Sequence, residues 1–137
     1  MIELYTDGAS MGLSGPSGLG FVAKNKQFCL EGYRYMPRLT NHEAEFHALL
    51  FALEALPLDT NGEILSIRSD SKILVDTIEK AYTRNPRFLT IYQAIERHLD
   101  SYAHVFIKWI PDMKNKRADQ LARLGLHTKS EKITSCS

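Results

Sequence analysis

The order in which hydrophobic patterns change along the chain is the strongest constraint on its fold. The N-terminal part holds three runs in which polar and apolar residues alternate, "IELYT" and two within "LGFVAKNKQFCLEGYRYM", and these predict three strands. The first strand should end near Asp7. Lys24-Asn25-Lys26 should join the second and third as a hairpin, with Asn25 in a left-handed turn position.

Helical and strand patterns then alternate to the end of the chain. Thr40 or Asn41 can cap the first helix, and Pro57 closes it. The strand "EILSIRSD" ends at Asp70, and Ser71 starts a second helix. A helix "FLTIYQAIERHLDSY", a strand "HVFIKWI" and a last helix "NKRADQLARLGL" complete the series.

This order, β-β-β-α-β-α-α-β-α, predicts an α/β fold with a five-stranded mixed sheet flanked by helices. The chain has 137 residues, enough for one domain. We expect that domain to span residues 1–126 and residues 127–137 to form a flexible polar tail.

The cellular setting follows from what the sequence lacks. There is no apolar run long enough to span a membrane and no signal-peptide layout, so we expect a cytoplasmic protein. Cys29 and Cys136 lie far apart without metal-ligand spacing, so both thiols should be reduced. The net charge of +1 does not indicate a nucleic-acid binder, although local basic clusters can bind phosphates.

Four acidic residues lie where side chains from separate elements can meet. Asp7 and Asp70 each end an expected strand, and Glu45 and Asp119 lie near the start of a helix. Taken singly, they are explained as turn residues or helix-dipole partners, and their spacing does not show that they converge. If they converge, such carboxylates suit Mg²⁺ or Mn²⁺. Two such ions about 3.5–4 Å apart can activate a water and stabilise a leaving oxygen at a phosphodiester.

Four short motifs carry a resemblance to a known family. They are "YTDGAS" with "GPSGLGFV", "TNHEAEFHAL", "SDSKIL" and "NKRADQLAR". In this order they resemble the motifs of the type 1 ribonuclease H family, in its short form without an N-terminal hybrid-binding domain. The resemblance covers about residues 1–126 and implies the ribonuclease H-like fold.

The resemblance implies a metal-dependent endoribonuclease that hydrolyses the RNA strand of RNA–DNA hybrids and leaves 5′-phosphate and 3′-hydroxyl ends. Two Mg²⁺ ions, for which Mn²⁺ can substitute, would be held by the residues that match the family's catalytic acids, with Asp7 bridging both. These are Asp7, Glu45, Asp70 and Asp119. The resemblance also implies substrate contacts for Gly8, Ala9, Ser10, Thr40, Asn41 and Ser71. For Thr40 and Ser71, helix capping is an equally good explanation.

Glu43 lies two residues from Glu45, and two helical positions differ by about 200°, so both cannot face one site. The Ala-Glu match selects Glu45, and Glu43 should face solvent.

The chain departs from the family in several places. His42 stands where many members have a second asparagine, and the loop "PDMKNKR" lacks their mobile histidine, which predicts a slower or metal-sensitive enzyme. The short "KAYTRNPRF" replaces a long basic insertion, so affinity for substrate should be weak and salt-dependent. Trp109 is expected in the core.

Two other functions remain open at this stage. One is a different nuclease on the same fold, since fold does not settle substrate. The other is a hybrid-binding module that has lost turnover. We expect a monomer, with an RNA–DNA hybrid as partner and no membrane association.

Overall fold

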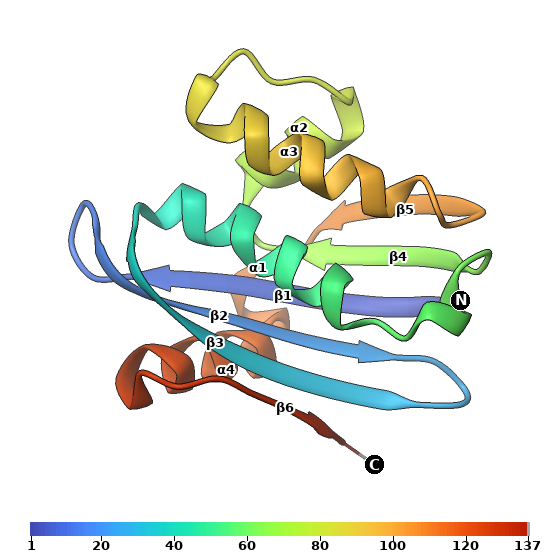
Figure 1. The fold of residues 1–137 in the computed structure, drawn as a ribbon, viewed down its shortest axis with the longest axis horizontal. Coiled ribbons are helices and arrows are strands. Elements are labelled where there is room, and N and C mark those ends of the chain that lie inside the picture. Colours follow the sequence, from blue (N-terminus) through green and yellow to red (C-terminus); the bar gives the residue numbers. More distant parts are fainter. Residues whose placement is uncertain (137) are drawn as a thin grey trace.

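The computed structural model describes residues 1–136, which form a single mixed sheet with helices on both faces (Figure 1). The strand order is β5-β4-β1-β2-β3-β6. The strands are β1 (Ile2–Ser10), β2 (Gly15–Lys24), β3 (Cys29–Leu39), β4 (Ile64–Ser69), β5 (His104–Trp109) and β6 (Lys132–Ser135). The α-helices are α1 (Asn41–Ala55), α2 (Lys72–Lys80), α3 (Pro86–Leu99) and α4 (Lys116–Thr128). The expected α/β class is confirmed, with six strands instead of five.

Strand β1 lies at the centre of the sheet and pairs differently on its two sides. Its parallel pairing with β4 ends at Thr6 opposite Ser69, whereas its antiparallel pairing with β2 continues to Ser10. Asp7 is therefore inside a strand, and the expectation that the strand ends there is wrong. Asp7 and Asp70 both come directly after the last parallel pair, so they lie beside each other where β1 and β4 stop pairing.

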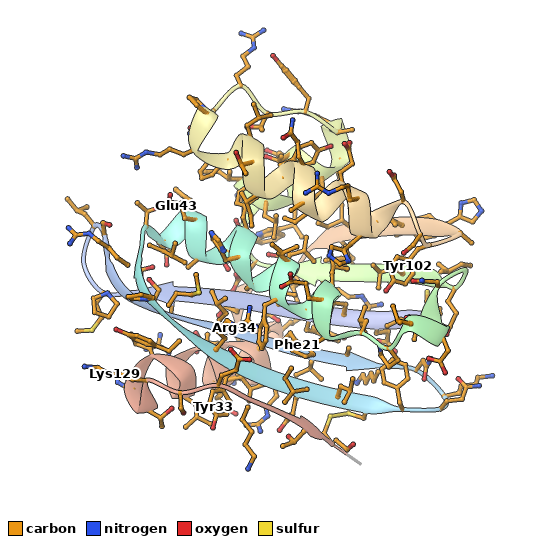
Figure 2. All side chains as sticks on the ribbon, in the orientation of Figure 1. Phe21, Tyr33, Arg34, Glu43, Tyr102 and Lys129 are labelled. Carbon is orange, nitrogen blue, oxygen red and sulfur yellow. A yellow bond between two sulfur atoms is a disulfide. The ribbon has the colours of Figure 1, made fainter. Side chains whose placement is uncertain are left out.

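Helices α1 and α4 pack on opposite faces of the sheet. The ring of Phe21 in β2 contacts that of Phe51 in α1 edge to face, with centroids 5.2 Å apart. Gly20, the preceding residue of β2, faces α4, because a Cβ on it would lie 2.5 Å from the backbone nitrogen of Ala122. Since successive strand residues point to opposite faces, the two helices enclose the sheet between them. Figure 2 shows side chains, including Phe21, filling the space between α1 and the strands.

Side-chain caps define where three helices begin. Thr40 accepts a hydrogen bond from the backbone of Glu43, whose carboxylate accepts one from the backbone of Thr40, which makes a capping box at the start of α1 (Glu43 is labelled in Figure 2). Ser71 caps α2, and Asn85 caps α3 ahead of Pro86. The starts at Thr40 and Ser71 agree with the sequence pattern, whereas α3 begins before the expected Phe88. Glu43 has a capping role that the solvent-facing prediction missed.

The β2–β3 hairpin uses Asn25 in a different way from the expected one. Within residues 1–136, the residues other than glycine with positive φ are Ala81 and Lys129, so Asn25 is not left-handed. Its side-chain oxygen instead accepts hydrogen bonds from the backbone N–H groups of Gln27 and Phe28, at 2.8 and 2.9 Å. An Asx-type turn therefore replaces the left-handed residue.

The C-terminal segment is ordered by the sheet, which corrects three expectations. Strand β6 pairs antiparallel with β3, Leu30 lying opposite Ser135, so the segment is not a frayed polar tail and the sheet has a sixth strand. The next residues along this ladder, Cys29 and Cys136, form a disulfide, so they are not reduced thiols. The backbone groups at the edge of β3 make this pairing, so the polar side chains of the segment gave no sign of a strand. No helix within residues 1–136 is both long and apolar enough to cross a bilayer.

Candidate active site

Gly8 sets the distance between β1 and α1. A Cβ on Gly8 would lie 2.5 Å from the carbonyl oxygen of Ala44, so the two backbones can be this close only with glycine at this position. The N–H of Gly8 donates a hydrogen bond of 2.7 Å to Oε1 of Glu45. Glycine at position 8 is therefore required by the packing of α1 on β1. This packing brings Glu45 next to Asp7, the residue before Gly8.

Three of the four predicted acids converge. Carboxylate oxygens of Asp7, Glu45 and Asp70 all lie within 4.8 Å of one another. Asp7 is only 5% exposed and Glu45 only 6%, while Asp70 is half-buried. The three come from β1, from α1 and from the residue after β4, so acids far apart in the sequence share one site.

Asp119, the fourth predicted acid, lines the same cavity from α4. It lies outside the closest cluster, and its Oδ2 accepts a hydrogen bond of 3.1 Å from Nε of Arg123, one helical turn later. This ion pair is mostly exposed, so it holds Asp119 only weakly. Its carboxyl group already lies close enough to Asp7 to raise the pKa of that residue.

The cavity has a volume of about 830 Å³ and opens to solvent at the ends of β1 and β4. Several residues predicted to contact substrate line it, namely Gly8, Ala9, Ser10 and Asn41. Thr40 and Ser71 are engaged as helix caps, and His42 is exposed. Further lining residues were not predicted from the sequence: Met11, Trp109, Pro111, Asp112, Arg123, Leu126 and His127. Of these, Arg123 could have been identified from its i, i+4 spacing to Asp119.

Trp109 lies at the rim of the cavity, and its expected place in the core is wrong. Its side chain is 43% exposed, and its Nε1 donates a hydrogen bond of 3.1 Å to the backbone carbonyl of Asp70. The ammonium of Lys72 lies 5.3 Å from the ring centroid. Because β5 is an edge strand, Trp109 has a neighbouring strand on one side only, where Ser69 of β4 lies opposite it.

Burial and mutual repulsion make the acid cluster bind protons tightly. Burial raises the pKa of Asp7 to about 10, and the charges of Glu45 and Asp70 act in the same direction. Burial and the charge of Asp70 raise the pKa of Glu45 to about 8, although the N–H of Gly8 favours its charged form. Burial also raises the pKa of Asp70.

The donor set fits a divalent cation. Within residues 1–136, none of Asp7, Glu45 and Asp70 forms an ion pair with a basic side chain. Buried carboxylates without a counter-charge are unfavourable, and a hard cation with oxygen ligands relieves that repulsion. The cluster therefore matches the chemistry of Mg²⁺ and Mn²⁺.

Comparison with known proteins agrees with the fold. The family model described as RNase H matches residues 1–127. The chain is 38% identical over 130 residues to a protein of Enterococcus faecalis named "Putative hydrolase EbsB", covering 92% of this chain and 94% of that one. It is 32% identical over 128 residues to ribonuclease HI of Halobacterium salinarum, covering 91% of this chain and 64% of that protein.

A solved structure shows the same architecture. The crystal structure of LC11-RNase H1 in complex with an RNA/DNA hybrid superimposes with a TM-score of 0.86 at 28% identity, covering 94% of this chain and 99% of that one. The six-stranded sheet, the buried acids at the end of its parallel ladder and the match over residues 1–127 lead to one conclusion: the chain belongs to the RNase H family.

Proposed function

We propose that this protein is a metal-dependent endoribonuclease that hydrolyses the RNA strand of RNA–DNA hybrids and leaves 5′-phosphate and 3′-hydroxyl ends. The observation that carries the proposal is the meeting of Asp7, Glu45 and Asp70 within 4.8 Å in an open cavity that Asp119 also lines. Relatives named ribonuclease HI, and a structural neighbour solved with an RNA/DNA hybrid, support the choice of substrate.

Asp7, Glu45, Asp70 and Asp119 would hold two Mg²⁺ ions, for which Mn²⁺ can substitute. Asp7 would be the ligand that both ions share, since its carboxyl group interacts with those of Glu45, Asp70 and Asp119. When bound, the ions supply an activated water and stabilise the charge on the leaving oxygen of the phosphodiester. The protein supplies the positions of the acids: the missing Cβ of Gly8 lets α1 approach β1, and the N–H of Gly8 then holds the Glu45 carboxylate beside Asp7.

The cavity wall supplies the substrate contacts. The backbone of Gly8, Ala9 and Ser10 forms one side of the cavity, and exposed Asn41 lies at the start of α1. Selection of RNA over DNA requires a contact to the 2′-hydroxyl, and in this proposal these backbone groups would make it together with Glu45. Thr40 and Ser71 would contact the DNA strand in addition to capping their helices.

A labelled hybrid incubated with Mg²⁺ or Mn²⁺ tests the proposal. Asp70→Asn should lower the cleavage rate by about 10²–10³-fold, because one charge of the cluster is lost. Asp76→Asn is the matched control, since Asp76 is an exposed acid on α2, outside the cavity lining, and its loss should leave the rate unchanged. Binding of hybrid without cleavage in either metal would favour a binding module, and cleavage of plain DNA duplex would indicate a different nuclease.

The proposal includes action as a monomer in the cytoplasm, where the hybrid substrate would be met. Cytoplasmic thiols are normally kept reduced, so the Cys29–Cys136 disulfide would form there only under oxidising conditions. Size-exclusion chromatography tests the monomer, and titration of free thiols with and without a reductant tests whether the disulfide forms.

A further inference from the structure

Asn115 stands at the start of α4, but its side chain does not cap the helix. Asparagine at this position usually accepts a hydrogen bond from the helix backbone, and here no such bond is formed. The side chain is instead buried, with 1% exposure, and Nδ2 donates a hydrogen bond of 2.8 Å to the carbonyl oxygen of Thr6. The Asn115 side chain therefore contacts β1 instead of capping its own helix.

The orientation of the Asn115 amide is determined by its partner. A carbonyl oxygen only accepts hydrogen bonds, so the NH₂ group must face Thr6 and Oδ1 must point away. Within residues 1–136, the buried side-chain oxygens without a hydrogen-bond partner are Oδ1 of Asn115 and Oγ1 of Thr6. They belong to the two residues that form this contact, although only the backbone carbonyl of Thr6 takes part in it. An unpaired buried polar atom costs stability, which indicates that the contact serves position more than stability.

The contact links two segments that carry predicted metal ligands. Thr6 directly precedes Asp7, and the backbone carbonyl of Asn115 accepts the N–H of Asp119 at 3.1 Å. Asn115 does not line the main cavity, so it is placed behind the acids and not among them. Its amide also lies near Asp70, where it opposes the effect of burial on the pKa of that carboxyl group.

We propose that Asn115 is a positioning residue: its side chain holds the β1 segment of Asp7 against the start of α4, which carries Asp119, and thereby sets the affinity of the acid cluster for divalent cations. The inference rests on the proposed function in that it assumes a cation at these acids. Packing at Gly18 and Gly20 holds α4 against β2, the strand that pairs with β1 at Ala9 and Asp7, and the hydrogen bond of Asn115 adds a direct side-chain tie to β1 itself.

Asn115→Ser tests this role, because serine caps helices as well as asparagine does but is too short to reach Thr6. The matched control is Asn85→Ser, which makes the same change at a residue that does cap its helix, α3. Two quantities are measured, Mn²⁺ binding to the free protein by calorimetry and the Mg²⁺ concentration that gives half-maximal cleavage of a hybrid. Asn115→Ser should weaken both by about 10–100-fold and keep most of the rate at saturating Mg²⁺, as for groups that orient metal ligands. Asn85→Ser should change neither.

A second variant covers the case in which Asn115→Ser does not fold. Asn115→Asp keeps the size of the side chain but cannot donate to Thr6, and it too should weaken Mn²⁺ binding, although its added negative charge favours cations. The proposal is overturned if a folded variant binds Mn²⁺ within about twofold of wild type, or if neither variant folds, which would make Asn115 a residue of stability alone.

Wild-type behaviour separates this test from that of the proposed function. A wild-type protein that binds Mn²⁺ but cleaves no hybrid overturns the function, and the binding measurements still decide the role of Asn115. A wild-type protein that binds no Mn²⁺ overturns both.

Discussion

Replacing Asp7 with asparagine should stabilise the metal-free protein at alkaline pH while abolishing cleavage. Asp7 is buried, and its carboxylate lies within 4.8 Å of those of Glu45 and Asp70. An asparagine side chain at this position would have the same shape without the charge. The cluster would then hold one negative charge fewer in a place where no basic side chain of residues 1–136 pairs with it.

The size of the effect follows from the geometry. Two unit charges 4.8 Å apart repel by about 3.5 kcal/mol at an effective dielectric constant of about 20. Proton uptake relieves part of this repulsion, because the pKa of Asp7 is raised to about 10. We therefore expect Asp7→Asn to raise the free energy of unfolding by about 2 kcal/mol near pH 9, or roughly 6–10 °C in melting temperature for a domain of this size.

The sign of the pH dependence is set by the direction of the shift. The pKa of Asp7 is higher in the folded state than in the unfolded chain, so proton binding favours folding at low pH. This contribution is fully present below about pH 4, the pKa of an unfolded aspartate, and is lost as the pH rises toward 10. Glu45, whose pKa is raised to about 8, acts in the same direction. The wild-type protein should thus lose stability between pH 7 and pH 9.

Thermal unfolding in EDTA measures this loss. The pH range from 7 to 9 avoids His47, whose pKa is lowered by burial and which acts below that range. Wild type and the exposed control Asp76→Asn should melt at lower temperature as the pH rises, and Asp7→Asn should change less. Added Mg²⁺ should stabilise wild type and leave Asp7→Asn unaffected. If wild type and Asp7→Asn lose stability in parallel, or if the variant is the less stable protein at pH 9, the acids do not repel one another as argued.

Three further changes test other parts of the structure. Gly8→Ala should lower the free energy of unfolding by about 1–3 kcal/mol through overpacking against Ala44 and should reduce cleavage by displacing α1; urea unfolding and the hybrid assay measure both. Cys29→Ser, or a reductant, should cost about 2–4 kcal/mol because the disulfide closes a loop with a sequence separation of 107, and an unchanged urea midpoint would show that β6 stays paired without it. Thr40→Ala should cost about 1 kcal/mol by removing the capping box. A rise in KM for hybrid with Thr40→Ala, absent from the cap variant Asn85→Ala, would reveal a phosphate contact.

Much of the fold was predictable because its signals are local. Thr40 and Ser71 each precede a helical pattern and each caps the helix that follows, as side-chain chemistry favours. Asp70 was expected at the end of a strand and comes directly after β4. The parallel pairing of β1 with β4 then brings it next to Asp7, which no local pattern records but which the order of elements implies.

The features that sequence reasoning missed depend on partners distant in the chain. Strand β6 forms because β3 offers an open edge, and Cys136 meets Cys29 only through that pairing. Trp109 is exposed because β5 is the other edge of the sheet. Asn115 has the sequence position of an ordinary helix cap, and only the fold shows that its side chain points to Thr6 instead.

The position of the acids follows from the way β1 changes partners. Up to Thr6 the strand has a neighbour on each side, and side chains alternate between the two faces of the sheet, so acids from α1 and α4 could not meet across it. Beyond Thr6 the β4 side is open, which is where Glu45 from one face and Asp119 from the other can approach Asp7. Such a meeting of like charges needs rigid support, and the chain supplies it on both faces. Gly8 allows α1 to touch β1, and Asn115 ties the start of α4 to the same strand. The repulsion among the acids is thus opposed by close packing at Gly8 and by the hydrogen bond of Asn115 to the main chain of β1.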